Sequence, residues 1–348
     1  MKLKVGPFEI SAQGPTFVVA EVGVNHNGDV ELAKQLVRAA KQAGADAVKF
    51  QTFRADRLAM AAAPKAAYQL QTTNPHESQL EMLRSLELPP DGYQQLAQLC
   101  QSLQLVFLST PYNHQDVDFL ESLGVVAYKI ASGQAVEPLF LEHVAQKGKP
   151  VLLSTGMCTL GEARHAVQTI RQTGNDQVMV LQCTTNYPSA VSDAHLLAMV
   201  TLGRELDVPV GYSDHTQSLT AATVAVALGA CVIERHLTLD KTQAGPDHAC
   251  SSDPQEFALL VKTVREAKQA MGSPVKKPTH AEQQNIHTVR RGVVAARPIP
   301  AGTELTQANL ALKRPLSFFA GADLPKLIGR QAAVDIEPDT PLAPEMIR

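Results

Sequence analysis

The sequence lacks blocks of like charge and carries little net charge. Its 31 Lys and Arg residues and 34 Asp and Glu residues are interspersed along 348 positions and leave a formal net charge of −3. Nucleic-acid and anionic membrane surfaces are usually met by clustered basic side chains. The charge pattern therefore predicts no nucleic-acid and no membrane partner.

Long apolar runs and a leader segment are also missing. The longest apolar stretch, residues 219–233, is shorter than the roughly 20 residues that span a bilayer, and it includes two threonines and a glycine. Two lysines lie within the first five residues, but the apolar segment of a signal peptide does not follow them. We expect a soluble, cytoplasmic protein.

The five cysteines lack the C-x-x-C spacing of metal and redox motifs. Their number is odd, and most of them lie in or beside apolar runs. Such cysteines are typical of reduced thiols in a cytoplasm. They are Cys100, Cys158, Cys183, Cys231 and Cys250.

The chain instead contains eight short apolar runs, each followed by a segment with helical patterning. This alternation is typical of a parallel sheet covered by helices. An open dinucleotide-binding sheet would carry G-x-G-x-x-G after its first strand, and that motif is absent there. We therefore predict an α/β fold, a (β/α)₈ TIM barrel. The predicted strands are 16–22, 47–50, 105–108, 125–130, 151–153, 178–181, 208–211 and 231–234.

Two regions depart from this alternation of strands and helices. Residues 54–90 connect the second strand to its helix and are too long for an ordinary loop; their Ala-rich and Leu-rich patches predict a partly helical cover over the rim of the barrel. After Gly272 the chain turns polar and then breaks into short apolar pieces separated by turns. We predict a barrel over 1–272, a linker over 273–289 and a small, mostly β domain over 290–348. So small a core is marginal by itself, so this domain is expected to dock against something larger.

Two histidines follow two neighbouring predicted strands. His215 comes after 208–211 and His236 after 231–234. In a TIM barrel the residues past the carboxyl ends of the strands meet at one rim. Two imidazoles there can hold a divalent metal and leave coordination positions for substrate and water. The alternative is that each histidine caps a helix or completes a core hydrogen bond.

Lysines and hydroxyls also lie at the predicted strand ends. Lys49 and Lys129 with several Ser and Thr residues suit a small, doubly anionic ligand such as a phosphorylated carboxylate. Each lysine could instead pair with a neighbouring carboxylate, or act as a Schiff-base nucleophile. Glu21 could act as a general base with a raised pKa, or be a buried partner of Lys49 or Arg235.

Several motifs in order resemble those of the sialic acid synthase family. The resemblance covers nearly the whole chain, and residues 290–348 resemble the antifreeze-protein-like (SAF) domain of that family, including Lys313-Arg314-Pro315. The barrel motifs are AEVGVNHNG at 20–28, KFQT at 49–52, STP at 109–111, KIASG at 129–133, LSTGM at 153–157, GYSDH at 211–215, ERH at 234–236 and GPD at 245–247.

The resemblance implies condensation of phosphoenolpyruvate (PEP) with an N-acylated amino-sugar aldehyde to a nine-carbon 2-keto acid and phosphate. It also implies that His215 and His236 hold Mn²⁺, or another divalent cation such as Mg²⁺ or Co²⁺, and that Glu21 is catalytic. Sugar-binding positions are Gln134, Asp247 and Arg314, the last supplied by the partner subunit of a domain-swapped homodimer. Matching PEP-binding positions are Lys49, Thr110, Lys129, Ser132, Ser154, Thr185, Tyr187 and Ser213.

The chain departs from the family pattern at two positions expected near the sugar. Gln134 stands where N-acetylneuraminate synthases usually have an acidic residue, and 316–321 replaces a Gly-rich turn after Pro315. These departures favour an acceptor less polar than N-acetylmannosamine. The candidate acceptors are N-acetylmannosamine and, as the runner-up, a 2,4-diacetamido-6-deoxy hexose that leads to a legionaminic- or pseudaminic-type acid. A Schiff-base aldolase and a non-catalytic saccharide-binding protein are the remaining alternatives.

Overall fold

The computed structural model describes residues 2–67 and 69–348. The chain divides into two compact units, Met1–Gly272 and Ser273–Arg348. In this described part, none of the helices combines the length and the apolar content that crossing a membrane requires.

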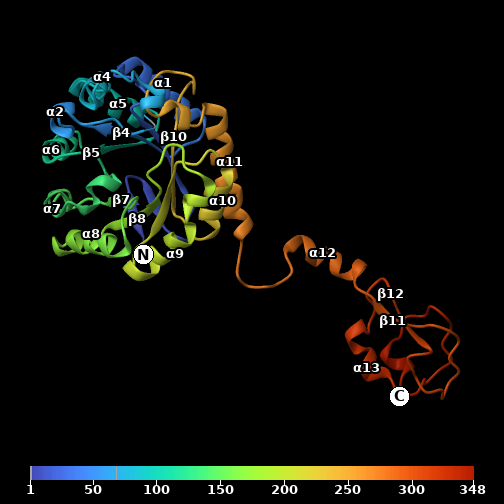
Figure 1. The fold of residues 1–348 in the computed structure, drawn as a ribbon. Helices are drawn as coiled ribbons and strands as arrows, with labels where there is room; N and C mark the ends of the chain where they lie inside the picture. The colour runs from blue at the N-terminus through green and yellow to red at the C-terminus, as the bar shows by residue number, and fades with distance from the viewer. Residues whose placement is uncertain (1, 68) are drawn as a thin grey trace. The chain divides into compact units, whose positions relative to one another are not determined.

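The first unit is a barrel of eight parallel strands (Figure 1). Hydrogen bonding follows the order β5-β4-β3-β10-β9-β8-β7-β6, and β5 lies beside β6, so the barrel is nearly closed. The predicted TIM barrel is confirmed. Its strands are β3 (Phe17–Gly23), β4 (Ala47–Thr52), β5 (Val106–Pro111), β6 (Tyr128–Ile130), β7 (Val151–Ser154), β8 (Val178–Cys183), β9 (Val210–Asp214) and β10 (Val232–His236).

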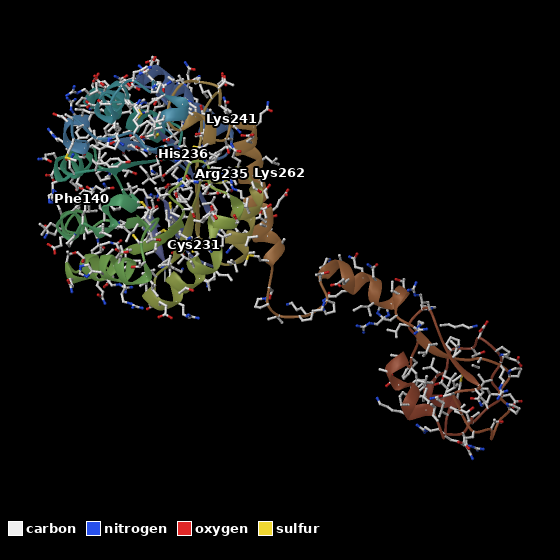
Figure 2. All side chains as sticks on the ribbon, in the orientation of Figure 1. Phe140, Cys231, Arg235, His236, Lys241 and Lys262 are labelled. Atoms are coloured by element: carbon white, nitrogen blue, oxygen red, sulfur yellow. The ribbon has the colours of Figure 1, made fainter. Side chains whose placement is uncertain are left out.

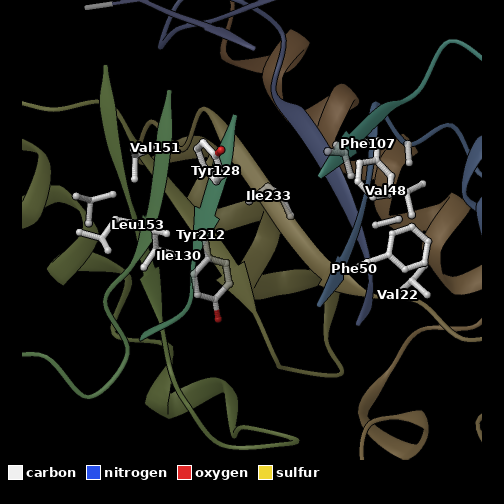
Figure 3. Packing of buried hydrophobic residues seen from close by; sticks show 14 of the residues in the cluster. Val22, Val48, Phe50, Phe107, Tyr128, Ile130, Val151, Leu153, Tyr212 and Ile233 are labelled. Atoms are coloured by element: carbon white, nitrogen blue, oxygen red, sulfur yellow. The ribbon is translucent and has the colours of Figure 1, made fainter. Parts of the chain in front are cut away.

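Helices follow the strands and cover the outside of the barrel. Local sequence sets where they begin: the Asp29 side chain accepts hydrogen bonds from the first turn of α1, and Thr159 with Glu162 forms a capping box on α8. Phe50 stacks on Phe107 at the strand–helix interface, beside Val22 and Val48 (Figure 3). The helices are α1 (Val30–Gln42), α5 (Pro90–Ser102), α6 (His114–Ser122), α7 (Pro138–Ala145), α8 (Leu160–Gln172), α9 (Leu196–Leu206), α10 (Leu219–Ala227) and α11 (Pro254–Met271).

A hairpin that the sequence analysis did not predict closes the amino end of the barrel. Its strands are β1 (Leu3–Val5) and β2 (Phe8–Ile10), which pair antiparallel. Leu3, Val5 and Ile10 are buried in a cluster with apolar residues of the barrel strands. Each strand has only three residues, too few to show a clear period in the sequence.

The long connection between β4 and α5 contains three short helices, α2 (Ala55–Leu58), α3 (Gln69–Thr72) and α4 (Gln79–Ser85). Met82 and Leu86 pack with Val24 and Phe53, which follow the first two barrel strands. This packing attaches the connection to the carboxyl end of the barrel, where the sequence predicted a partly helical cover.

The second unit begins with a helix inside the predicted linker. This helix, α12 (His280–Val289), starts at a capping box of Thr279 and Glu282 and buries none of its residues, which is why its composition resembled a linker. Beyond it, β11 (Gly292–Ala295) pairs antiparallel with β12 (Leu310–Lys313), and isolated bridges surround a small apolar core. One short helix, α13 (Leu324–Leu327), completes the predicted mostly β unit.

Candidate active site

A layer of polar side chains fills the carboxyl half of the barrel interior. Successive residues of a strand point to opposite faces, so inward-pointing positions recur every second residue. Val19, Ala47 and Leu152 belong to the buried apolar cluster of the barrel, and two residues further along the same strands stand Glu21, Lys49 and Ser154. This polar layer surrounds a cavity. The cavity is lined by Glu21, Lys49, Gln51, Thr110, Tyr112, Lys129, Ala131, Ser132, Ser154, Cys183, Tyr187, Ser213, His215, Glu234 and His236. We call it the inner chamber.

Lys49 is the centre of the charge network in the inner chamber. Its Nζ lies 2.6 Å from Glu21 Oε2 and 3.8 Å from Glu234 Oε1, and it donates to Thr110 Oγ1 at 3.0 Å. Lys129 Nζ lies 3.6 Å from Glu234 Oε1, which also accepts from Ser213 Oγ at 3.1 Å. Two lysines and two carboxylates thus balance each other in a buried site.

Arg235 takes no part in this network. It pairs with Asp214 and donates to the Ser218 carbonyl at 2.5 Å. Of the two partners considered for Glu21, the structure therefore shows Lys49 and not Arg235.

Burial raises the pKa of Glu21 to about 7, against the lowering effect of Lys49 and with a further increase from the Glu234 charge. Glu21 also accepts a hydrogen bond from Gln51 Nε2 at 3.1 Å, and Gln51 Oε1 accepts from Tyr112 at 3.0 Å. A carboxyl group with this pKa exchanges its proton near neutral pH, which is the property required of a general base or acid.

His215 and His236 lie side by side, with ring centroids 5.4 Å apart. His215 Nδ1 is 2.8 Å from the Thr184 carbonyl and 3.9 Å from Cys183 Sγ. The Tyr187 ring is 4.1 Å from the His215 ring and 5.8 Å from the His236 ring. Figure 2 labels Cys231, just before β10, and His236, the last residue of β10, at opposite ends of that strand. The two histidines thus share the carboxyl rim, as the sequence predicted.

The histidine pair fits a divalent cation. His236 Nδ1 is buried without a hydrogen-bond partner. Burial lowers the pKa of His236 well below its usual value, so the ring is neutral and can offer a nitrogen lone pair to a metal. His215 Nδ1 is hydrogen-bonded to the Thr184 carbonyl, so His215 Nε2 is the nitrogen available to a metal. No group of three or more His, Cys, Asp or Glu side chains suited to a metal occurs in the part of the chain that the structure describes. A cation here would have two protein nitrogens and open positions for other ligands.

Ser132 and Thr185 meet across Gly156. The Gly156 amide donates to Ser132 Oγ at 2.8 Å, and a Cβ at Gly156 would lie 2.2 Å from Thr185 Oγ1. Only glycine permits this approach. Ser132 lines the inner chamber, whereas Thr185 is exposed and is not among the lining residues.

A second cavity opens beside the inner chamber, and we call it the outer chamber. Gln51, Tyr112, Tyr187 and His236 line both chambers, which therefore adjoin each other. Asp247 lines the outer chamber, with Oδ2 3.8 Å from His236 Nδ1, and burial raises its pKa to about 6. The remaining lining residues are Val24, Leu58, Gln69, Gln79, Met82, Leu83, Leu86 and Pro246.

Not every predicted residue of the barrel unit lines these chambers. Gln134 lies in a 3₁₀ turn (Ser132–Val136) after β6 and is not among the residues that line either one. Arg314 follows β12 in the second unit, where its Nε donates to the Val289 carbonyl at 2.9 Å.

Sequence reasoning gave no site role to Tyr112 or Cys183, although both line the inner chamber. Their signal was present. Cys183 comes two residues after the buried Leu181 on β8, and Tyr112, the residue after β5, comes two residues after Thr110, so both continue the inward-pointing register.

Comparisons with known proteins place these residues in a family. The NeuB family model matches residues 36–276, and the SAF domain model matches residues 290–348. N,N'-diacetyllegionaminic acid synthase of Legionella pneumophila is 44% identical over 95% of this chain and 94% of that protein. N-acetylneuraminate-9-phosphate synthase of Mus musculus is 35% identical over 97% and 94%.

A solved structure agrees with the sequence matches. The N-acetylneuraminic acid (sialic acid) synthetase of Leptospira borgpetersenii, crystallised with citrate, superposes with a TM-score of 0.72 at 29% identity, covering 82% of this chain and 95% of that one. The chain therefore belongs to the NeuB family, the sialic acid synthase family that its motifs resemble, and it carries a C-terminal SAF domain.

Proposed function

We propose that this chain condenses PEP with an N-acylated amino-sugar aldehyde and forms a nine-carbon 2-keto acid and phosphate. The observation that supports this most strongly is the composition of the inner chamber, where two lysines and several hydroxyls lie beside a histidine pair and a carboxyl group with a pKa near 7. The relatives named above are synthases of nonulosonic acids, in keeping with this chemistry.

PEP would occupy the inner chamber. Lys49 and Lys129 supply positive charge for its carboxylate and phosphate, and hydroxyls around them supply directional donors. The unpartnered Ser154 Oγ is one donor available to a ligand. The residues assigned to PEP are Lys49, Thr110, Lys129, Ser132, Ser154, Thr185, Tyr187 and Ser213, and Thr185 would need to approach from its exposed position.

Glu21 would act as the base. The methylene carbon of PEP forms a bond to the aldehyde carbon, and positive charge develops at C2 of PEP, close to the Glu21 and Glu234 carboxylates. Water adds to C2 while ionised Glu21 takes its proton. The C2–O bond then breaks, phosphate leaves with the bridging oxygen, and the new C2 hydroxyl loses its proton to become the keto group. The alkoxide formed from the aldehyde takes up a proton to become a hydroxyl.

His215 and His236 would hold Mn²⁺ or another divalent cation such as Mg²⁺ or Co²⁺. Such an ion, when bound, supplies Lewis-acid activation of the acceptor aldehyde. The two rings would also fix the reacting end of the acceptor at the junction of the two chambers, because His236 lines both.

The outer chamber would receive the rest of the acceptor. Leu58, Met82, Leu83 and Leu86 give it an apolar wall, and no Lys or Arg occurs among its described lining residues. That lining favours a 2,4-diacetamido-6-deoxy hexose over a phosphorylated sugar or N-acetylmannosamine, and so a legionaminic- or pseudaminic-type product. Mass spectrometry of the keto acids made from these sugars with PEP and Mn²⁺ tests the choice; a clear preference for N-acetylmannosamine would refute it.

Arg314 would complete the acceptor site from the second subunit of a domain-swapped homodimer, with Asp247 contacting the same sugar. The long segment before residue 290 permits such a crossing. We place the reaction in the cytoplasm, which suits the five free cysteines.

Metal dependence separates this proposal from its competitors. EDTA should abolish phosphate release and Mn²⁺ should restore it, whereas borohydride added with substrate should leave the enzyme active. A Schiff-base aldolase would show the reverse pattern. A saccharide-binding protein would bind sugar and release no phosphate from PEP.

A further inference from the structure

The loop between β3 and α1 contains Asn25, His26 and Asn27, to which the proposed reaction assigns no role. Asn25 and His26 are buried, each only 1% exposed, and Asn27 is partly exposed. The side chains of Asn25 and Asn27 do not enter either chamber. Both reach across to residues 237–252, the segment that follows β10 and carries Asp247.

Asn25 is bound to both ends of that segment. Its Nδ2 donates to the Leu237 carbonyl at 2.9 Å and to Ser251 Oγ at 2.8 Å. Ser251 Oγ in turn donates to the Asp247 carbonyl at 2.6 Å. Asn25, Ser251 and the Asp247 backbone therefore form one buried chain of hydrogen bonds, which we call the Asn25 chain.

A second set of contacts holds the middle of the same segment. Asn27 donates to the Ala244 carbonyl at 3.2 Å, and its Oδ1 is 3.2 Å from His248 Nε2. The other ring nitrogen, His248 Nδ1, is 2.7 Å from Thr238 Oγ1. A Cβ at Gly245 would lie 2.7 Å from the His248 ring, so the segment packs closely against these side chains.

His236, which precedes this segment, and Asp247, which lies within it, are secured differently. His236 is the last residue of β10, and its carbonyl also accepts from the Ser252 amide at 2.9 Å. Asp247 lies in an irregular turn, and its carbonyl is held by the side chains of Ser251 and Cys250. Loss of the Asn25 chain should therefore displace Asp247 more than His236.

We propose that Asn25 is a positioning residue for the sugar acceptor, acting through Ser251 to hold Asp247 at the wall of the outer chamber. This rests on the proposed function, in which Asp247 contacts the acceptor. The PEP contacts are on the barrel strands and around Gly156, so the Asn25 chain should govern the acceptor and leave PEP unaffected.

Asn25→Asp tests this with little change in shape. A carboxylate cannot donate to the Leu237 carbonyl, and it would draw the Ser251 hydrogen away from Asp247. The acceptor KM should rise about tenfold or more, while the PEP KM stays within about twofold. An unchanged acceptor KM in the folded variant overturns the proposal.

Asn175→Asp is the matched control. Asn175 is also buried, and its Nδ2 donates to two carbonyls, those of Ala145 at 3.2 Å and Lys149 at 2.9 Å, before β8 begins at the opposite end of the barrel. Both Asn25→Asp and Asn175→Asp should lower the thermal midpoint, because each loses buried hydrogen bonds, but Asn175→Asp should leave the acceptor KM unchanged. An equal rise in acceptor KM would show a general loss of structure and overturn the proposal.

Two further variants keep the outcome decisive. If Asn25→Asp does not fold, Ser251→Ala removes the same link with a smaller change and should raise the acceptor KM selectively; no rise overturns the proposal. Asp247→Asn separates the premise from the inference. An acceptor KM unchanged in Asp247→Asn refutes the assigned role of Asp247, whereas a rise there without a rise in Asn25→Asp refutes the positioning role alone.

Discussion

The amino and carboxyl halves of the barrel interior are built from the same eight strands and serve opposite purposes. On β10, Val232 belongs to the apolar cluster, and Glu234 two residues later lies between two lysines. On β7 the same step leads from Leu152 to Ser154. The first half releases apolar surface from water and stabilises the fold. The second half keeps charges away from water, which costs free energy unless each charge is paired.

This difference shows how a stable scaffold can hold a site of buried charges. Glu21, Lys49, Lys129 and Glu234 are all nearly inaccessible to solvent, and their mutual pairing offsets the cost of burying them. The parallel ladder fixes their positions, because Glu21 and Lys49 are direct partners in the register of β3 and β4. A substrate would therefore meet charges already in position.

The largest expected effect comes from Glu21→Gln, which removes the base and keeps the side-chain shape. We expect kcat to fall by about 10³-fold, within the usual range for loss of a general base. PEP affinity, measured by calorimetry, should change little. Normal phosphate release by this variant would remove Glu21 from the mechanism.

Leu152→Ala and Ser154→Ala test the amino and carboxyl halves of the barrel interior on one strand, β7. Leu152→Ala leaves a cavity in the apolar half and should lower the free energy of unfolding by about 2–5 kcal/mol, with kcat nearly unchanged. Ser154→Ala should leave stability nearly unchanged and raise the PEP KM. Denaturant unfolding and steady-state kinetics on both variants measure this; a reversed pattern would contradict the division of the interior.

Arg314→Ala affects neither half of the barrel. If Arg314 reaches the outer chamber of a second copy, its removal should raise the acceptor KM by tenfold or more, on the order expected for loss of a charged hydrogen bond, and leave the PEP KM almost unchanged. Steady-state kinetics in both substrates, with light scattering to check the oligomeric state, measure this. Equal changes in both KM values would exclude the assigned role.

The smallest expected effect is a shift in the pH dependence of kcat/KM for PEP. Glu21 has a pKa of about 7 and must be ionised to act as a base, so kcat/KM for PEP should fall about tenfold per unit as the pH drops below 7. The Glu234 charge contributes to raising that pKa. In Glu234→Gln the acid limb should therefore shift to lower pH, and an unshifted limb would argue against Glu21 as the titrating group.

The sequence could predict the barrel and most of the polar layer because both depend on local patterns. Apolar runs located all eight strands, and the polar residues at or just beyond the carboxyl ends of those runs included Glu21, Lys49, Lys129, Ser154 and Ser213. His215 and His236 were predicted together for the same reason, since parallel strands end at one rim.

Local sequence patterns could not predict the features that depend on contacts between segments far apart in the chain. The Asn25 chain joins residues more than 200 positions apart, and nothing in the local pattern around Asn25 indicates Ser251 as its partner. The family resemblance predicts Gln134 beside the sugar; in the structure Gln134 lies in the turn that follows β6 and does not line either chamber. The hairpin β1–β2 was missed because its strands are too short to show a period.

The central claim is that the inner chamber holds PEP while water attacks C2 and phosphate leaves by cleavage of the C–O bond. It can be tested most directly with PEP labelled with ¹⁸O at the oxygen that bridges carbon and phosphorus, using Mn²⁺ and a 2,4-diacetamido-6-deoxy hexose. Mass spectrometry should find the label in the released phosphate and none in the keto acid. Label in the keto acid, or no phosphate release with any amino sugar, would contradict the account.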